Sequence, residues 1–238
     1  MKLGKNLGIF TITWARSQIE AQRIIESLTI LSQVNLPIIA IDNNSDKDFI
    51  QEVSNIGNIN IFIASKKGLW EQIKIGLTII QEKNLPFFLY TESDKKLFFQ
   101  QISDFLNQAQ QIINQNPSFG VILPARNTES FNTFPPIQKK TEDEINKIIG
   151  QIIGLETDYT YGPRIISSSL IPSLLSLPDD INWGWLTASV LLAKKLGRNI
   201  YAVPMSLPCP EKDRLEDEKE LRLKQKQNHL LAISIYQQ

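Results

Sequence analysis

Two carboxylates separated by one residue follow a short apolar run near the middle of the chain. Glu92 and Asp94 come directly after residues 86–90, with Ser93 between them. If the chain bends there, both side chains face one cleft, and Mg²⁺ binds one or two carboxylates together with substrate phosphates. Such a metal ion stabilises a diphosphate leaving group. The spacing is also typical of a polar turn with an aspartate helix cap, so both interpretations stand.

Three further places in the chain carry polar or charged side chains that could contact a ligand. Asp42 could accept a hydrogen bond from it, or it would end its strand in an Asx turn. Lys66 and Lys67 would bind phosphate, with Gly68 allowing close approach of the backbone, or both lysines would be solvated. Arg16 has the same two interpretations.

The elements that must position these residues alternate between strand and helix. Apolar runs predict strands at 7–13, 36–41, 59–64, 86–90 and 119–124, and helical spacing follows the first, third and fourth of them. This alternation predicts parallel strands joined by right-handed crossovers, hence an open, doubly wound α/β sheet. Ligands bind outside the carboxyl ends of such strands, where all the polar residues above lie.

The rest of the chain is less regular. Residues 127–140, with Pro135-Pro136, predict a loop, and Thr141 with Glu144 predicts a capping box that opens a helix ending near 154. A helix to about 196 and a short strand at 199–203 follow. The densely charged residues 211–227 predict an exposed helix.

Composition excludes several kinds of chemistry. The 238 residues include one histidine, His229, and one cysteine, Cys209, too few for a structural zinc site or an intrachain disulfide. The 25 basic and 25 acidic residues balance, which argues against nucleic acid as a partner. No run of about 18 apolar residues predicts a transmembrane helix, no signal peptide is evident, and the lone thiol favours a cytoplasmic location.

The order of these pieces resembles the glycosyltransferase A fold, especially its family-2-like members, over residues 8–125. The resemblance implies an open, mostly parallel sheet with an irregular acceptor-side half. It implies that Glu92 and Asp94 hold Mn²⁺ or Mg²⁺ and the sugar diphosphate, and that the loop at Asp42 holds base and ribose. The expected nucleotide-sugar-binding residues are thus Thr11, Arg16, Asp42, Lys67, Gly68, Glu92 and Asp94.

The acceptor side resembles these enzymes only in part. Inverting members usually have Glu-Asp after a Gly-Trp pair, and the aspartate is the catalytic base, whereas Leu186-Thr187 follows Gly184-Trp185 here. Asp179 or Asp180 is the expected substitute, with Asp158 as a further alternative. A general base must come within about 3 Å of the acceptor hydroxyl.

Four more residues complete the acceptor-side hypothesis. Trp183 and Trp185 would form a wall for a sugar ring, or at least one of them belongs to the core. Arg164 would face an acidic acceptor or the diphosphate, or it belongs to a structural turn. His229 would be a third metal ligand, as in some retaining relatives, but a histidine on a helix surface is the favoured interpretation.

The predicted function is a metal-assisted glycosyltransferase with a UDP- or GDP-type sugar donor and an unidentified hydroxyl acceptor. One domain is expected over 1–238, with a nucleotide-sugar half (7–125), an acceptor-side half (126–210) and a C-terminal charged helix (211–238). The alternative is a non-catalytic nucleotide-binding module of the same fold. A sugar-phosphate nucleotidyltransferase ranks lower because residues 11–16 contain no glycine, and no Gly-x-Gly-x-x-Gly supports a dinucleotide site.

Overall fold

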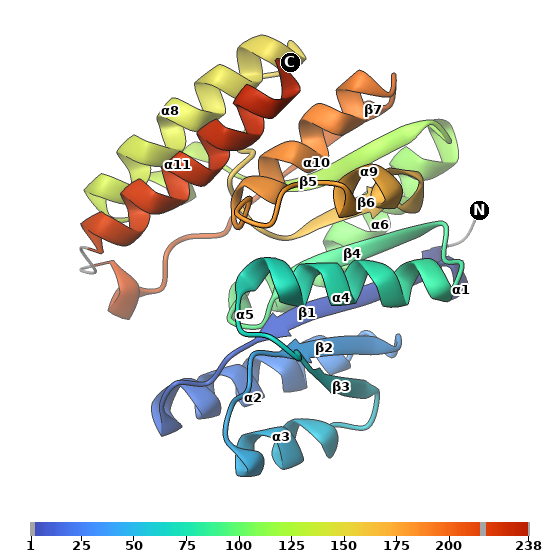
Figure 1. The fold of residues 1–238 in the computed structure, drawn as a ribbon, viewed down its shortest axis with the longest axis vertical. Coiled ribbons are helices and arrows are strands. Elements are labelled where there is room, and N and C mark those ends of the chain that lie inside the picture. The colour runs from blue at the N-terminus through green and yellow to red at the C-terminus, as the bar shows by residue number, and fades with distance from the viewer. Residues whose placement is uncertain (1–2, 215–217, 238) are drawn as a thin grey trace.

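The computed structural model describes residues 3–214 and 218–237 and forms a layered α/β structure (Figure 1). The first half alternates strands and helices as the sequence predicts. Its elements are α1 (Leu3–Asn6), β1 (Leu7–Thr13), α2 (Gln18–Ser32), β2 (Ile38–Asp42), α3 (Lys47–Ser54), β3 (Ile59–Ile63), α4 (Leu69–Glu82), β4 (Phe87–Glu92), α5 (Lys96–Gln100) and α6 (Ile102–Gln115).

The second half contains more helix than the sequence predicts. Its elements are β5 (Phe119–Arg126), α7 (Thr128–Asn132), α8 (Pro136–Ile153), β6 (Arg164–Ser167), α9 (Ile171–Leu175), α10 (Gly184–Lys195), β7 (Asn199–Met205) and α11 (Lys219–Tyr236), with 3₁₀ turns at Ser168–Leu170 and Glu211–Asp213.

The loop predicted for residues 127–140 is wrong, because two helices occupy most of it. The side chain of Asn127 caps α7, and α8 begins at Pro136. Proline is tolerated in a first helical turn, where its missing N–H would have no partner anyway. Thr141, predicted to open the helix, lies inside it, and its hydroxyl donates to backbone carbonyls of the preceding turn.

The sheet has seven strands in the order β3-β2-β1-β4-β6-β5-β7. All neighbours pair in parallel except β6, which runs antiparallel between β4 and β5. The predicted fold class, an open and mostly parallel sheet flanked by helices, is therefore confirmed. The reversed strand β6 was not predicted; it pairs Arg164 with Tyr90 and so brings its first residues to the carboxyl end of β4.

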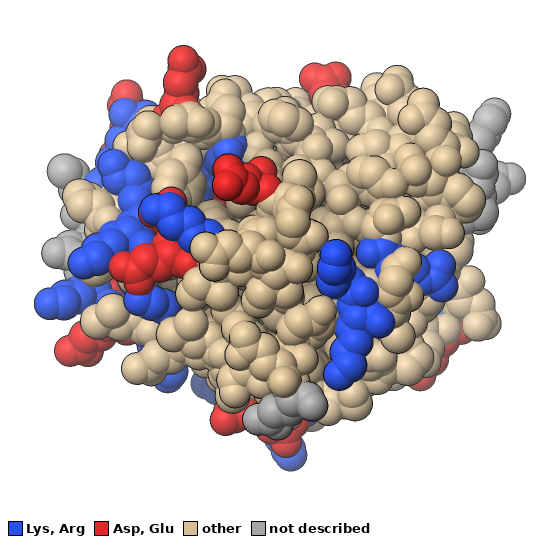
Figure 2. Space-filling view, turned by 90° about the horizontal axis from the view of Figure 1, so that it is seen from above, with Lys and Arg blue, Asp and Glu red and all other residues tan. Residues whose placement is uncertain are grey.

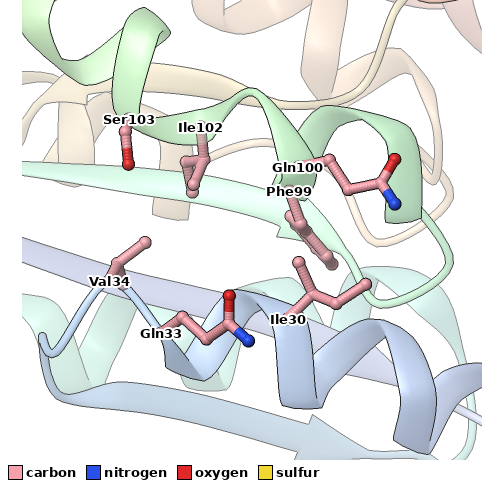
Figure 3. Close-up of a pocket in the computed structure, with 7 residues that line it drawn as sticks. All are labelled: Ile30, Gln33, Val34, Phe99, Gln100, Ile102 and Ser103. Carbon is pink, nitrogen blue, oxygen red and sulfur yellow. The ribbon is translucent and has the colours of Figure 1, made fainter.

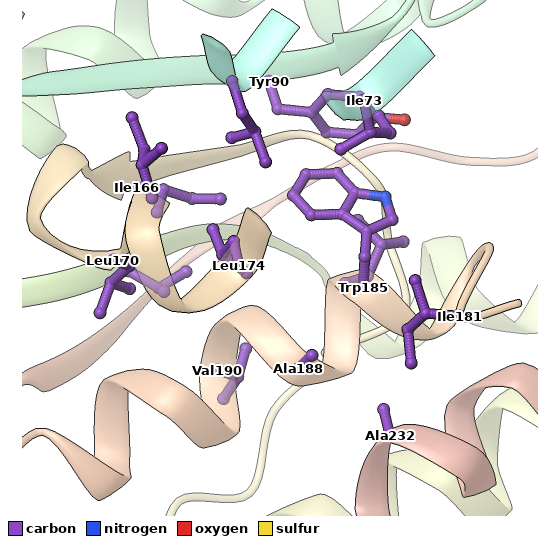
Figure 4. Close-up of a cluster of buried hydrophobic side chains, with 14 of the residues drawn as sticks. Ile73, Tyr90, Ile166, Leu170, Leu174, Ile181, Trp185, Ala188, Val190 and Ala232 are labelled. Atoms are coloured by element: carbon purple, nitrogen blue, oxygen red, sulfur yellow. The ribbon is translucent and has the colours of Figure 1, made fainter. Parts of the chain in front are cut away.

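Helices cover both faces of the sheet and enclose a core on each. One core contains side chains of α4, α8, α9, α10 and α11, and the other contains side chains of α2, α3, α5 and α6. In the first core the indole of Trp185 stands edge-on to Tyr90, with ring centroids 4.6 Å apart and an interplanar angle of 88° (Figure 4). Such edge-to-face pairs are favourable beyond their buried area. They fix α10 against the end of β4.

The C-terminal helix α11 is only partly exposed. Its first turn is open to solvent, but its second half packs on α10 and alongside α8, burying Ala232 and Ile233 (Figure 1). Lys226 forms an ion pair with Glu144 of α8. Gly184 lets the two helices meet, since a Cβ there would lie 2.1 Å from the Asn228 carbonyl oxygen. The exposed helix predicted for residues 211–227 is confirmed over 219–227, where no side chain is buried, whereas Glu211–Asp213 form a 3₁₀ turn and residues 215–217 lie outside the described residues.

Charges on the α8 and α11 side of the molecule are mixed in sign. Figure 2 shows blue and red side chains intermingled at one end of this face and a separate group of blue side chains toward the other, among a mainly uncharged surface. Within the described residues, no helix is both long and apolar enough to cross a bilayer.

His229 is buried on α11, so the expectation of a surface histidine is wrong. Its Nδ1 lies 2.8 Å from the Thr187 hydroxyl of α10. Burial, reinforced by the charge of Arg164, lowers the pKa of His229 from 6.5 to about 3. The folded protein therefore holds a neutral imidazole at neutral pH.

The lowered pKa of His229 predicts a pH-dependent stability. The unfolded chain takes up the proton first, so the stabilisation is complete above the ordinary pKa and falls as pH drops toward the folded-state value. Between about pH 7 and about pH 5 we expect wild type to lose about 2 kcal/mol more than His229→Gln. Urea unfolding of both proteins at the two pH values measures this. An identical loss in both would contradict it.

Candidate active site

Glu92 and Asp94 lie at the carboxyl end of the central strand β4, on the turn into α5. Glu92 is the last residue of the strand and is buried, whereas the side chain of Asp94 is 66% exposed. The ammonium Nζ of Lys95 lies 3.4 Å from Glu92 Oε2 and 3.2 Å from Asp94 Oδ1. The turn thus gathers one buried carboxylate, one open carboxylate and one cation within a few ångströms.

The carboxylate of Glu92 has unusual surroundings. Among the residues that the structure describes, neither of its oxygens has a hydrogen-bond partner, although both are buried. Burial raises the pKa of Glu92, against the opposing charge of Lys95. Nearby, the buried hydroxyl of Tyr90 also lacks a hydrogen-bond partner, and burial and then the charge of Glu92 raise its pKa well above the ordinary value. Apart from the ion pair of Glu92 with Lys95, these buried polar atoms have no partner in the described residues, and a bound ion or ligand is one explanation for atoms in that state.

Gly162 gives Glu92 the space it occupies. A Cβ on Gly162 would lie 1.7 Å from Oε1 of Glu92, so no side chain fits there without moving the carboxylate. Gly162 precedes β6, and the antiparallel pairing of β6 with β4 sets this close approach. The sequence contained Gly162 within a turn motif but gave no sign that it faces Glu92.

Replacing Gly162 by alanine is expected to destabilise the fold by about 1–3 kcal/mol, because the added methyl group forces Glu92 or β6 to shift. Chemical denaturation measures the loss. Gly57→Ala is the matched control, since Gly57 is exposed and a Cβ there meets nothing within 4 Å. Equal stability of the two variants would show that Glu92 is not held as described.

Asp42 holds the loop after β2, which is the predicted position of the base and ribose. Its Oδ2 accepts hydrogen bonds from the hydroxyls of Thr13 at 2.9 Å and Ser45 at 2.8 Å, and its Oδ1 accepts from the backbone N–H of Ser45 at 2.6 Å. The carboxylate is fully buried. Asp42 therefore ends its strand through a side-chain bond to the backbone N–H three residues on, rather than two residues on as in the expected Asx turn. Its contact with a nucleoside stays a prediction.

Two amides join this loop to its neighbours. The Nε2 of Gln72 donates to the carbonyls of Thr13 and Ile41, at 2.9 and 2.6 Å, and so ties α4 to the ends of β1 and β2. The backbone N–H of Gly68 donates to Asn43 Oδ1 at 3.0 Å. Gly68 has φ 139°, which favours glycine, and it caps the N-terminus of α4. These bonds fix the loops around the predicted nucleotide position.

The other predicted donor-side residues differ in how accessible they are. Thr11 is fully buried within β1, and in the described part of the chain its hydroxyl has no hydrogen-bond partner. Lys67 is exposed just before α4. Arg16 is paired with Glu20 at 2.6 Å, and its guanidinium lies 5.3 Å from the centre of the Trp14 ring. Trp14, 45% exposed at the end of β1, was not predicted as a site residue, although its position after the first strand was visible in the sequence.

A buried ionic cluster at the end of β5 was not predicted. Arg126 donates from Nε to Asp158 Oδ2 at 2.5 Å and from Nη2 to Glu142 Oε2 at 2.6 Å. Three aromatic rings surround its guanidinium at 4.5–5.3 Å: Phe131, Phe134 and Tyr161. Burial alone would raise the pKa of Asp158, but Arg126 lowers it below its ordinary value. The cluster ties β5, α8 and the segment before β6 together beside Glu92.

The predicted acceptor-binding residues lie mostly inside the protein. Arg164 is fully buried and donates to the backbone carbonyls of Tyr159, Tyr161, Gly162 and Leu186. Burial lowers its pKa to about 10. Trp185 is fully buried in the core, as one of the two interpretations expected, and Trp183 is half-buried against it. Acceptor binding by these three residues stays a prediction.

Asp179 and Asp180 lie on the loop before α10. Asp179, with its side chain 87% exposed, pairs with Lys74 of α4 at 2.9 Å, and this contact lowers its pKa. Asp180 is exposed. Leu186 and Thr187, where inverting transferases carry Glu-Asp, are buried. The structure therefore brings Asp179 to α4 rather than to Glu92, and the catalytic role of both aspartates stays a prediction.

The donor set at the end of β4 suits a hard divalent cation. Glu92 and Asp94 supply carboxylate oxygens, and those of Glu92 have no hydrogen-bond donor in the fold. Within the described ranges no group of three or more His, Cys, Asp or Glu residues is arranged to hold a metal ion. A Mg²⁺-type ion needs only one or two carboxylates plus phosphate and water, so this donor set fits.

A pocket of about 330 Å³ lies away from these residues. Figure 3 shows it between the C-terminal end of α2 and the α5–α6 segment, lined by Ile30, Gln33, Val34, Phe99, Gln100, Ile102 and Ser103. None of the predicted site residues lines it. Helix α2 ends near the amino ends of the strands, whereas Glu92 lies at the carboxyl end of β4.

Comparison with solved structures identifies the fold. Glucosyl-3-phosphoglycerate synthase from Mycobacterium tuberculosis, solved with Mn²⁺, UDP and glucosyl-3-phosphoglycerate, matches with a TM-score of 0.66 and 12% identity, covering 97% of this chain and 79% of that one. Mannosyl-3-phosphoglycerate synthase from Rubrobacter xylanophilus matches with a TM-score of 0.69 and 11% identity, covering 96% and 72%. No protein-family model and no curated protein sequence matches the chain.

These matches confirm the predicted glycosyltransferase A fold. They extend over nearly the whole chain, including the second half, where sequence reasoning found only a partial resemblance. At 11–13% identity the likeness establishes the fold alone. A shared fold does not by itself define the reaction that a protein catalyses.

Proposed function

We propose that this protein is a glycosyltransferase that moves a sugar from a nucleotide-diphosphate donor to an acceptor hydroxyl, with a divalent metal ion held by Glu92 and Asp94. The observation that carries the proposal is the pair of carboxylates at the end of the central strand, with the oxygens of Glu92 buried and without hydrogen-bond donors. In open α/β sheets this edge is where ligands bind. Similar structures have been solved with Mn²⁺ and UDP-glucose, which supports the assignment.

The donor would lie along the ends of β1, β2 and β4. Trp14 offers an exposed ring to a nucleobase, and Asp42 holds the adjacent loop in place. Lys67 and the N-terminus of α4 at Gly68 lie at the same edge and would attract the diphosphate. Mn²⁺ or Mg²⁺ held by Glu92 and Asp94 would neutralise negative charge on the diphosphate leaving group.

The acceptor would lie on the side of β6 and α10. Asp179 or Asp180 is proposed as the base that takes the proton of the acceptor hydroxyl. Both are exposed on the loop before α10, and the ion pair of Asp179 with Lys74 keeps that carboxylate ionised. The Arg126 cluster holds Asp158 and so the segment that carries Gly162. Because Gly162 lies against the carboxylate of Glu92, the cluster helps to position Glu92.

One observation favours a second candidate, a non-catalytic module that binds nucleotide without turnover. Leu186 and Thr187 fill the position of the usual Glu-Asp pair and are buried, so no carboxylate stands there. The two candidates share donor binding and differ in turnover.

Calorimetric titration with UDP-sugars and GDP-sugars in the presence of Mn²⁺ tests the proposal. We expect one nucleotide series to bind, and we expect binding to require the metal ion. Donor hydrolysis or transfer to an acceptor, followed by mass spectrometry, then separates the enzyme from the non-catalytic module. If neither series binds, both candidates fail.

A further inference from the structure

The two carboxylates proposed to hold the metal ion already lie beside a positive charge of the protein, the ammonium of Lys95. Lys95 Nζ lies 3.4 Å from Glu92 Oε2 and 3.2 Å from Asp94 Oδ1. It pairs with the same two carboxylates that would hold a divalent ion. Both carboxylates therefore have a counter-ion supplied by the chain itself.

The position of Lys95 is built into the fold. The residue is the N-cap of α5, directly after the turn that follows β4, and its ammonium lies 6.0 Å from the centre of the Tyr161 ring. A cation over an aromatic face at this distance is attracted to it. Only 27% of the Lys95 side chain is exposed, so water screens these contacts less than it would on an open surface. Lys96, the next residue, points elsewhere and pairs with Glu26 of α2 at 3.2 Å.

We propose that Lys95 is a resident counter-ion that competes with the divalent cation for Glu92 and Asp94, and so sets the metal affinity of the site. An ammonium and a divalent ion cannot occupy the space between the two carboxylates together, because they repel each other at this distance. Metal binding must therefore displace Lys95 and break both ion pairs. This inference rests on the proposed function and names a regulation of that same site.

The test measures binding of Mn²⁺ alone to the full chain, from the electron paramagnetic resonance signal of free Mn²⁺. We expect Lys95→Met to bind Mn²⁺ about fivefold more tightly than wild type, the scale of a partly screened ion pair. Lys96→Met is the matched control and is expected to keep the wild-type affinity. Lys95→Arg retains a cation and is expected to bind no more tightly than wild type.

An affinity of Lys95→Met equal to or weaker than that of wild type would overturn the inference, as would absence of Mn²⁺ binding by both proteins. Lys95→Gln, of similar length and without charge, serves as the second variant if the methionine variant does not fold. The assay contains no nucleotide, so its outcome is separate from donor binding. Tighter Mn²⁺ binding without any nucleotide-sugar binding would leave the inference standing while the proposed function fails.

Discussion

Replacing Asp94 by asparagine is expected to weaken Mn²⁺-dependent binding of a nucleotide diphosphate by about 100-fold, because the substitution removes one of two carboxylates proposed to hold the metal ion. The fold should be unaffected. The side chain of Asp94 is 66% exposed and that of Lys95 is 27% exposed, so solvent screens their ion pair in part. Exposed ion pairs contribute about 0–1 kcal/mol, so the free energy of unfolding should change by no more than that.

Calorimetry with UDP or GDP and Mn²⁺, beside a denaturation curve, separates the two effects. Asp104→Asn is the control, because Asp104 is an exposed aspartate in the first turn of α6. Loss of binding with unchanged stability in the Asp94 variant alone assigns the effect to the site. If Asp94→Asn binds the nucleotide within about twofold of the wild-type affinity, a change of only about 0.4 kcal/mol, the proposal that Asp94 holds a metal ion is contradicted.

The first half of the fold is predicted well because each of its strands is marked by a local sequence pattern. β1 matches its predicted bounds of 7–13, and each bound of β2, β3, β4 and β5 lies within two residues of its prediction, because apolar runs between turn residues mark these strands. β6 escaped prediction for a different reason. It has four residues, and its place between β4 and β5 depends on pairing with strands far away in the sequence. No local pattern encodes that partner choice.

The same distinction applies to the candidate site. Strand order alone placed Glu92 and Asp94 at the carboxyl edge, since parallel strands end on the same side. Gly162 and Glu92 are 70 residues apart in the chain, and their contact depends on the pairing of β6 with β4, so no local sequence pattern predicts it. His229 was misjudged because its neighbours on α11 are charged, whereas burial is decided by the packing of α10 and α8.

Arg126→Met is expected to destabilise the protein by about 3–5 kcal/mol, because removing one member of a buried ion pair leaves the other uncompensated. Asp158 is buried and accepts from Nε and Nη2 of Arg126 at 2.5 and 3.0 Å, while Glu142 accepts from Nη2 at 2.6 Å. Methionine fills part of the space among the three aromatic rings, so loss of charge dominates over loss of volume.

A double variant tests whether the uncompensated carboxylate is the cause. Arg126→Met with Asp158→Asn should recover part of the lost stability, because an amide is less costly to bury without a partner than a carboxylate. Arg23→Met, on the exposed face of α2, is the matched control and should change the free energy of unfolding by less than about 0.5 kcal/mol. Urea denaturation of the four proteins gives the comparison. If Arg126→Met lies within about 1 kcal/mol of wild type, the cluster does not hold β5 and α8 together, and its proposed support of Gly162 and Glu92 fails with it.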